Sequence, residues 1–334
     1  MRVSRVHGRR APAVVAAPAI VGAPAVTAVL ASVANAGTGA RRPSPAPVLV
    51  RQDVSRGHTS PKSVVDSGTG LFLAQNMMYR HTITVYDRRF RLVKTISDAV
   101  ELGRLGVSGF PSTYRGAPVE AAFTPDGSRA YVSNHEPTGP KLRRPGHDVG
   151  SPLPGYDRSF VYRLDVRRLR IDRAIAVGSV PKALAVTPAG RFVLAGNWCS
   201  YSLRVISTRL ARRVREIPSG RYPRGVAVDG ASRFAYITVM GSFDVARLDL
   251  RSFRVSWLRR VGNAPRSMAI APAGRSLYVG NYGSNTVSKI RTRDMAVVQT
   301  VATAARPIGI AYDGPARRLW VACYSGAIDV FADA

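Results

Sequence analysis

Short apolar runs separated by polar turns fill most of the chain. In residues 265–290 the runs SMAIA and SLYVG flank a Pro-Ala-Gly turn, and a third run, TVSKI, follows a polar Asn-Tyr-Gly-Ser-Asn stretch. Runs of this length bounded by Gly, Pro and Asn are typical of β-strands, because Pro presets φ and Gly accepts a positive φ in a tight turn. The stretch therefore predicts three antiparallel strands and no helix.

The same pattern returns along the chain at a regular spacing. Similar stretches begin at six prolines: Pro61, Pro118, Pro181, Pro223, Pro265 and Pro307. The last four of these prolines lie 42 residues apart, and each unit reads as four strands, A to D in chain order. A repeat of about 40 residues with several strands indicates a β-propeller, in which each repeat forms one blade. We predict an all-β fold, a β-propeller of four-stranded blades, with six blades counted.

The last repeat lacks a fourth strand after Phe331, whereas residues 46–54, APVLVRQDV, form an apolar run ahead of the first repeat. Closing the ring with this N-terminal strand would remove an exposed sheet edge, which is a recognised aggregation hazard. We therefore expect residues 46–54 to complete the last blade, so that the propeller spans residues 46–334.

Three segments resemble the YVTN-type repeats of the YncE-like family of secreted β-propellers: AFTPDGSRAYVSN (122–134), SMAIAPAGRSLYVGN (267–281) and SNTVSKI (284–290). The resemblance covers roughly residues 60–334. It implies a propeller fold, export and a binding role, and it carries no catalytic motif. Relatives commonly have seven blades, so a seventh, degenerate blade stays open as the alternative to six.

The N-terminal 36 residues have the pattern of a targeting segment. An Arg-rich start precedes an uncharged Ala/Val-rich run from Ala11 to Ala34, and Ala34-Asn35-Ala36 offers small residues at a cleavage site. We expect a signal peptide at 1–36, a linker at 37–45, and a secreted or extracytoplasmic monomer. A retained membrane anchor is the alternative, because the apolar run is long, although prolines interrupt it.

The chain is strongly basic, with a net charge of +29 from 49 Lys and Arg, nearly all Arg, against 20 Asp and Glu. Codon bias in a GC-rich genome explains such an excess without a function. The alternative is polyanion binding, because blade topology puts the A–B and C–D turns on one face, the turn face, where arginines gather. A phosphate-rich partner (nucleic acid, wall polymer or anionic lipid surface) would suit them. The candidate polyanion-binding residues are Arg88, Arg89, Arg167, Arg168, Arg170, Arg212, Arg213, Arg251 and Arg254.

The opposite face carries the B–C and D–A loops and is called here the insertion face. Two long insertions, residues 99–116 and 135–158, fall in these loops on neighbouring blades, where a ligand or a protein partner would bind. The candidate ligand-binding residues are His58, His81, Asn134, His135, Glu136, His147, Asp148, Asn197, Trp198 and Tyr282. Histidines beside carboxylates suit a metal of unknown identity, whereas polar loops also tolerate His. Asn134 and Asn197 have a structural alternative, which is hydrogen bonding to the B–C turn.

Motifs of catalysis are absent from the sequence. It has no G-x-S-x-G, no H-E-x-x-H, no P-loop and no dinucleotide fingerprint. We therefore assign no catalytic residue, expect no cofactor, and predict a non-catalytic binding or scaffold protein. The alternative is a propeller enzyme, a lyase, a lactonase or a quinone- or metal-dependent oxidoreductase, whose site on the insertion face gathers single residues from several blades.

Overall fold

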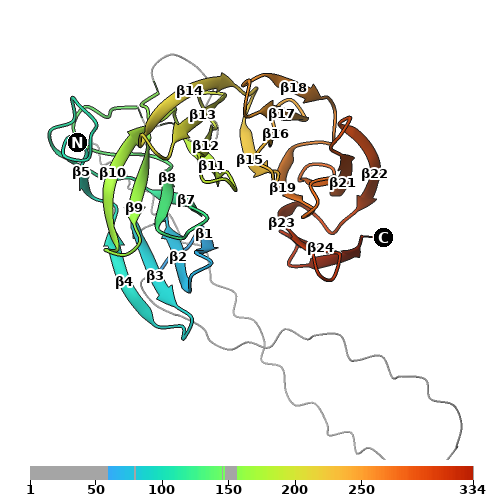
Figure 1. Cartoon of the computed structure of the whole chain (residues 1–334), viewed down its shortest axis with the longest axis horizontal. Helices are drawn as coiled ribbons and strands as arrows, with labels where there is room; N and C mark the ends of the chain where they lie inside the picture. Colours follow the sequence, from blue (N-terminus) through green and yellow to red (C-terminus); the bar gives the residue numbers. More distant parts are fainter. Residues whose placement is uncertain (1–58, 79, 145, 147–155, 334) are drawn as a thin grey trace, which may run out of the picture. The chain divides into compact units, whose positions relative to one another are not determined.

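Every regular element in the described part of the chain is a β-strand (Figure 1). The computed structural model describes residues 59–78, 80–144, 146 and 156–333. Strands β1 to β25 form six antiparallel sheets in chain order and one small hairpin. Each large sheet is a simple meander in which consecutive strands are hydrogen-bonded neighbours. The predicted all-β architecture, a propeller of four-stranded blades, is confirmed.

The strands of the first sheet are β1 (Ser63–Asp66), β2 (Leu71–Asn76), β3 (Thr82–Asp87) and β4 (Leu92–Ser97). Those of the second are β7 (Pro118–Phe123), β8 (Arg129–Asn134), β9 (Phe160–Asp165) and β10 (Arg170–Ala176). Those of the third are β11 (Pro181–Val186), β12 (Phe192–Asn197), β13 (Ser202–Ser207) and β14 (Arg212–Pro218). Those of the fourth are β15 (Pro223–Val228), β16 (Phe234–Val239), β17 (Asp244–Asp249) and β18 (Val255–Leu258). Those of the fifth are β19 (Pro265–Ile270), β20 (Ser276–Asn281), β21 (Thr286–Arg291) and β22 (Ala296–Ala302).

The sixth sheet has three strands among the described residues: β23 (Pro307–Asp313), β24 (Arg318–Cys323) and β25 (Ile328–Ala332). The residues expected to complete it, 46–54, lie outside the described residues, as do the expected signal peptide at 1–36 and the linker at 37–45. The small hairpin pairs β5 (Val100–Glu101) with β6 (Thr113–Tyr114) inside the first insertion.

The hydrophobic core lies between neighbouring sheets. In β12, Val193 packs with Tyr131 of the second sheet, whereas the next residue, Leu194, packs with Ile237 of the fourth. Successive side chains of a strand point to opposite faces, so a strand held between two sheets must be apolar on both. This requirement explains why the second and third strands read as continuous apolar runs rather than as alternating ones.

The first strands of neighbouring sheets lie side by side and form the inner layer (Figure 1). The neighbouring pairs are β1 and β7, β7 and β11, β11 and β15, β15 and β19, and β19 and β23. Small residues suit this crowded layer: an added Cβ at Gly225 would lie 2.7 Å from the Arg266 carbonyl oxygen of the next sheet. The inner layer therefore brings one segment of each of these sheets into one region.

No helix in the described part of the chain is long and apolar enough to span a membrane.

Candidate anion-binding surface

The C–D turns join the third and fourth strands, and in the first, second and fourth sheets they are built around an aspartate at the end of the third strand. Asp87 Oδ1 accepts the backbone N–H groups of Arg89 and Arg91 at 2.9 and 3.1 Å. Asp249 Oδ1 accepts the backbone N–H of Ser252 at 2.8 Å. An aspartate that binds backbone donors in this way closes its turn. The few acids of the turn face are therefore engaged by the backbone.

Hydrogen bonding keeps these carboxylates ionised. The side-chain hydrogen bond from Arg91 is the largest cause that lowers the pKa of Asp87. Backbone hydrogen bonds from Ser252 and then Arg251 lower the pKa of Asp249. The C–D turns of the first and fourth sheets thus each hold one ionised carboxylate, while Arg88, Arg89, Arg251 and Arg254 beside it are exposed.

One backbone feature gives four of these turns the same shape. Leu169, Ala211, Phe253 and Met295 lie 42 residues apart and have φ values of 47°, 47°, 59° and 57°. Non-glycine residues rarely adopt this left-handed conformation, so its recurrence marks a conserved turn geometry within the chain. Arginines next to these positions consequently emerge at equivalent places on successive sheets.

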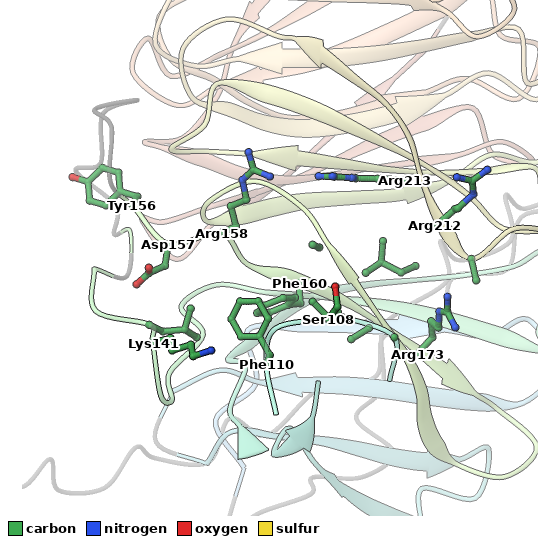
Figure 2. Close-up of a pocket in the computed structure, with 17 residues that line it drawn as sticks. Ser108, Phe110, Lys141, Tyr156, Asp157, Arg158, Phe160, Arg173, Arg212 and Arg213 are labelled. Atoms are coloured by element: carbon green, nitrogen blue, oxygen red, sulfur yellow. The ribbon is translucent and has the colours of Figure 1, made fainter. Parts of the chain in front are cut away.

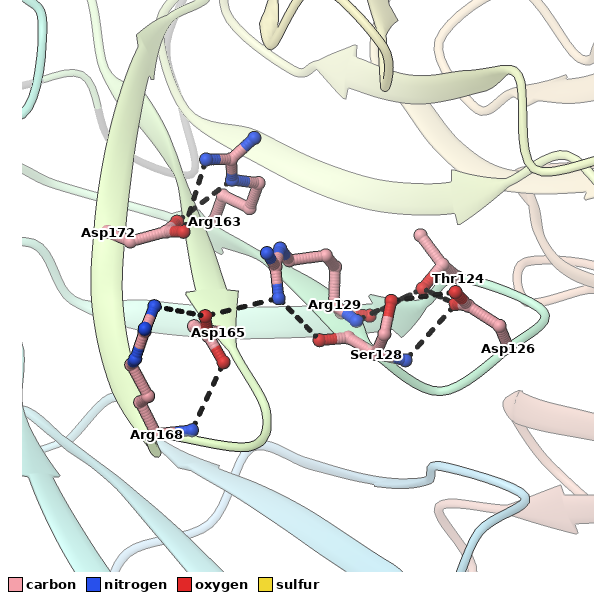
Figure 3. Close-up of polar contacts among 8 residues, drawn as sticks. All are labelled: Thr124, Asp126, Ser128, Arg129, Arg163, Asp165, Arg168 and Asp172. Carbon is pink, nitrogen blue, oxygen red and sulfur yellow. Dashed lines mark hydrogen bonds and ion pairs between the residues drawn. The ribbon is translucent and has the colours of Figure 1, made fainter.

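All nine candidate polyanion-binding arginines are exposed. Figure 3 shows the one that is paired: Arg168 Nη1 and Arg129 Nη1 lie 3.5 and 3.2 Å from Asp165 Oδ2. Burial opposes the ionisation of Asp165, but the backbone bond from Arg168 and these two charges outweigh it and lower the pKa. Arg163, which is not one of these candidates, forms two hydrogen bonds to Asp172: Nε donates to Oδ1 at 2.8 Å and Nη2 donates to Oδ2 at 3.1 Å (Figure 3). Among the described residues, the other eight candidates have no ion pair.

A groove of about 670 Å³ opens between the outer strands of the second and third sheets (Figure 2). Its described lining comes from the insertion 99–116, from Lys141, Leu142 and residues 156–158 of the second insertion, from Phe160 of β9, from strand β10 and from the start of strand β14. Strand β14 starts at the C–D turn and β10 ends at Ala176 toward the insertions, so the groove runs from the turn face toward the insertion face. The backbone N–H of Ala174 donates to Leu105 O at 3.0 Å, which fixes the first insertion along the edge of β10.

Aromatic rings form the floor of the groove. The ring of Phe110 stands edge-on to Phe160 at a centroid distance of 5.5 Å and to Tyr114 at 5.2 Å. Phe160 and Tyr114 are buried, whereas Phe110 is partly exposed. These contacts hold the first insertion on the second sheet and leave one ring facing the groove.

Cations dominate the walls: Lys141, Arg158, Arg173, Arg212 and Arg213 line the groove (Figure 2). Lys141 Nζ donates to Gly109 O at 3.2 Å, which links the two insertions. Among the described lining residues there is one carboxylate, Asp157, and its Oδ2 already accepts the backbone N–H of Arg144 at 2.6 Å. The groove therefore presents a large excess of positive charge to any occupant.

The side chain of Arg173 packs against Gly106 of the first insertion. Gly106 has a φ of +97°, and a Cβ added there would lie 2.9 Å from Arg173 Cζ. The guanidinium group thus packs directly on the backbone of the first insertion. Arg173 Nε is buried and has no hydrogen-bond partner among the described residues. An acceptor atom in the groove would satisfy this donor.

Two of the candidate histidines are described, and each contacts a carboxylate. His81 Nδ1 lies 3.3 Å from Asp98 Oδ2, and His135 Nδ1 lies 3.0 Å from Glu136 Oε1. Burial is the largest cause that raises the pKa of Asp98, against the opposing charges of His81 and Arg115. His58, His147 and Asp148 lie outside the described residues. Within the described ranges, no group of three His, Cys, Asp or Glu side chains is close enough to hold a metal.

The asparagines proposed for ligand binding are buried inside their sheets, so the structure does not place them on an exposed surface. Asn134 Nδ2 donates to Phe160 O at 2.9 Å, and Asn197 Nδ2 donates to Ser202 Oγ at 3.0 Å. Both bonds tie the second strand to the third. This placement favours the structural alternative for these two residues. Their amide groups hydrogen-bond strand C rather than the B–C turn.

Trp198 and Tyr282 each lie against a cation. Lys182 Nζ stands 4.3 Å from the centroid of the Trp198 ring, and Arg266 Cζ stands 5.3 Å from that of Tyr282.

The two insertions also meet, since Arg115 and Thr138 exchange backbone hydrogen bonds at 2.9 Å.

The sequence pattern alone did not single out five lining residues of the groove: Phe110, Lys141, Arg158, Phe160 and Arg173. The insertion residues among them belong to no repeat, and Arg173 lies within a strand rather than in a turn. The available signal was topological: both insertions flank the second sheet, so basic residues near their ends and on its outer strand had to lie close together.

The fold is similar to solved structures. A chain of Kuenenia stuttgartiensis hydrazine synthase matches with a TM-score of 0.50 and 16% identity over 86% of this chain and 99% of that chain. A functionally unknown protein from Desulfotomaculum acetoxidans DSM 771 matches with a TM-score of 0.55 and 14% identity over 78% of each chain. At such identities the likeness shows the fold alone. No known protein family and no curated protein matches the sequence.

Proposed function

We propose that this chain is an exported, non-catalytic binding protein that holds phosphate-bearing polymers along its turn face and in the groove between β10 and β14. The observation that carries the proposal is the charge of the described groove lining, five cations against one carboxylate that is engaged by a backbone N–H. A rim of exposed arginines continues this charge across the turn face.

Phosphate is the anion that this surface suits best. A guanidinium group presents its N–H donors as a planar fork that matches two oxygens of a phosphate group. Binding releases counterions from the polymer, so it is strong at low salt and independent of sequence. Phe110 and Tyr156 are the partly exposed rings of the described lining, and two rings are too few for the successive stacking that base reading would need.

Membership of the YVTN-type, YncE-like family and export belong to the same proposal. The repeats at 122–134 and 267–281 and the segment Ala34-Asn35-Ala36 support them. N-terminal sequencing of the protein from the producing cell should find a chain that begins near Gly37. An unprocessed chain in the cytoplasm would refute export and leave the binding proposal standing.

The binding test compares two variants with equal loss of charge. Arg212→Ser with Arg213→Ser removes two cations from the groove, whereas Arg221→Ser with Arg260→Ser removes two exposed cations from D–A loops on the insertion face. Anisotropy titrations would use labelled single-stranded DNA and polyphosphate, with polyglutamate as a polyanion without phosphate. Vesicles containing phosphatidylglycerol form a further arm.

We expect the groove variant to bind both phosphate polymers at least fivefold more weakly than the control variant, with polyglutamate weakest for every protein. If the groove variant loses affinity mainly for DNA, mainly for polyphosphate or mainly for the vesicles, that ligand identifies the phosphate source. Equal affinities of the two variants would show that the charge acts only as a solvated rim.

A further inference from the structure

The residue after the anchor proline is displaced from the regular pairing in each of the last four sheets. Pairing of the first strand with the second skips this residue, which is Lys182 in β11, Arg224 in β15, Arg266 in β19 and Ile308 in β23. A β-bulge of this kind leaves one residue unpaired and redirects its side chain. In the second sheet a wider irregularity between Pro118 and Ala121 includes Glu120.

These bulged residues meet at one cavity in the inner layer, which we call the axial site. It has a volume of about 210 Å³ and is lined by Glu120, Lys182, Arg224, Arg266 and Ile308, together with small and apolar residues of β11, β15 and β19. Three cations thus surround one carboxylate. The side chain of Lys62 in the first sheet is close enough to lower the pKa of Glu120 by its charge.

Contacts with backbone and aromatic rings hold the cations in place. Arg224 Nη1 donates to Lys182 O at 3.3 Å, which links the third and fourth sheets. Thr238 Oγ1 donates to Arg266 O at 3.0 Å, which fixes the bulge of the fifth. The rings of Trp198 and Tyr282, beside Lys182 and Arg266, follow second strands that end at the insertion face. The axial site therefore lies at the insertion-face end of the inner layer.

Two buried donors at this site lack an acceptor. Arg266 Nε and Ser267 Oγ are buried and have no hydrogen-bond partner among the described residues. An unsatisfied buried donor costs free energy, so native structures supply it with an acceptor. Both residues line the axial cavity, where a ligand oxygen would meet them.

The described residues that line the axial site include three cations and one carboxylate, Glu120. Burial is the largest cause that raises the pKa of Glu120, while the charges of Arg224, Lys62 and Arg266 oppose it. Even when Glu120 is ionised, the lining cations exceed it by two charges. Excess positive charge in a confined polar cavity attracts a multivalent anion.

We infer that the axial site binds one small oxyanion with at least two negative charges, held by Lys182, Arg224 and Arg266. The cavity admits a molecule of the size of pyrophosphate or a tricarboxylate rather than a polymer chain. This site is separate from the groove between β10 and β14, since the two share no lining residue. Its ligand could carry phosphate or carboxylate groups, which offer the same oxygens to a guanidinium fork.

The test is calorimetric titration of the full chain with inorganic phosphate, pyrophosphate and citrate, at one ionic strength. We expect one ion per chain and a rise in the midpoint of thermal unfolding with ligand, because a ligand that binds the folded state stabilises it. Arg266→Gln should weaken binding at least tenfold. The paired control, Arg260→Gln, removes one exposed cation from the D–A loop before β19, which lines neither the groove nor the axial site, and should leave affinity unchanged.

Two further variants keep the inference testable if Arg266→Gln fails to fold. Arg266→Lys keeps the charge but loses the fork, so it should bind several-fold more weakly. Glu120→Gln removes the opposing carboxylate and should bind several-fold more tightly, which a purely structural role would not produce. No binding by the wild type, several ions per chain, or equal loss in the axial and control variants would overturn the inference. Polymer binding through the groove would survive that result.

Discussion

Lys289 and Asp333 join the fifth and sixth sheets, with Lys289 Nζ 2.6 Å from Asp333 Oδ1. The Tyr312 hydroxyl donates to Asp333 Oδ2 at 2.6 Å, and the Tyr312 ring stacks on Tyr278 at a centroid distance of 5.2 Å. Lys289 lies in β21, and Asp333 directly follows β25. This cluster therefore ties the end of the described chain to the sheet before it.

The pH dependence of stability should report this cluster. Burial opposes the ionisation of Asp333, but the hydrogen bond from Lys289, the nearby Tyr278 hydroxyl and the hydrogen bond from Tyr312 lower its pKa from 3.8 to about 2. A lowered pKa contributes stability that is present above the unfolded value and lost as the pH falls through the folded one, here between about pH 4 and 2. We expect a contribution of about 2 kcal/mol to the free energy of unfolding.

Urea unfolding of Asp333→Asn checks this prediction. At pH 7 the free energy of unfolding of the variant should be about 2 kcal/mol lower than that of wild type, and below pH 4 it should change less with pH. Asp313→Asn in the same sheet is the control. If the free energy of unfolding falls equally steeply below pH 4 in wild type and in Asp333→Asn, Asp333 is not the source of this pH dependence.

A second prediction concerns the close approach of sheets in the inner layer. A Cβ at Gly225 would lie 2.7 Å from Arg266 O and 3.0 Å from Thr238 Oγ1, and the nearer contact is with backbone, which cannot easily move. Gly225→Ala should therefore lower the free energy of unfolding by about 2 kcal/mol. Gly230→Ala is the matched control, because its nearest neighbour would lie at 3.9 Å. Equal stabilities of the two variants would show that the inner layer yields to a methyl group.

A third prediction concerns the outer edge of β25, which pairs with no further strand among the described residues. Ile328 and Val330 on this strand are 60% and 45% exposed, which is high for apolar side chains of a strand. If residues 46–54 supply the missing fourth strand, deleting them should lower the thermal midpoint by several degrees. Deletion of residues 37–45, an equal length from the expected linker, should leave the midpoint unchanged. Equal midpoints for both deletions would reject closure by this segment.

The repeat made the fold predictable from the sequence. The anchor prolines Pro118, Pro181, Pro223, Pro265 and Pro307 are the first residues of β7, β11, β15, β19 and β23. Strand order could be inferred because short turns of the Pro-Ala-Gly kind permit little except antiparallel neighbours. Because consecutive strands pair, each of the six repeats forms one sheet.

The candidate sites were harder to predict, because they depend on side-chain direction. Lys182, Arg224 and Arg266 recur at 42-residue intervals, yet simple alternation along a strand misplaces them, since each sits at a bulge. Asn134 and Asn197 both end the second strand of their sheets, but their register turns them inward to hydrogen-bond strand C. Phe110 and Arg158 belong to insertions without a repeat, so only the structure brings them to one groove.

The salt dependence of polymer binding tests the central claim most directly. The dissociation constant for single-stranded DNA would be measured across a range of salt concentrations for wild type, the groove variant Arg212→Ser/Arg213→Ser and the control Arg221→Ser/Arg260→Ser. Each phosphate contact on a single strand contributes about 0.7 to the slope of log affinity against log salt, so the groove variant should lose roughly 1.4 of slope. The control should keep the wild-type slope. Identical slopes and affinities for all three proteins would contradict phosphate binding in the groove.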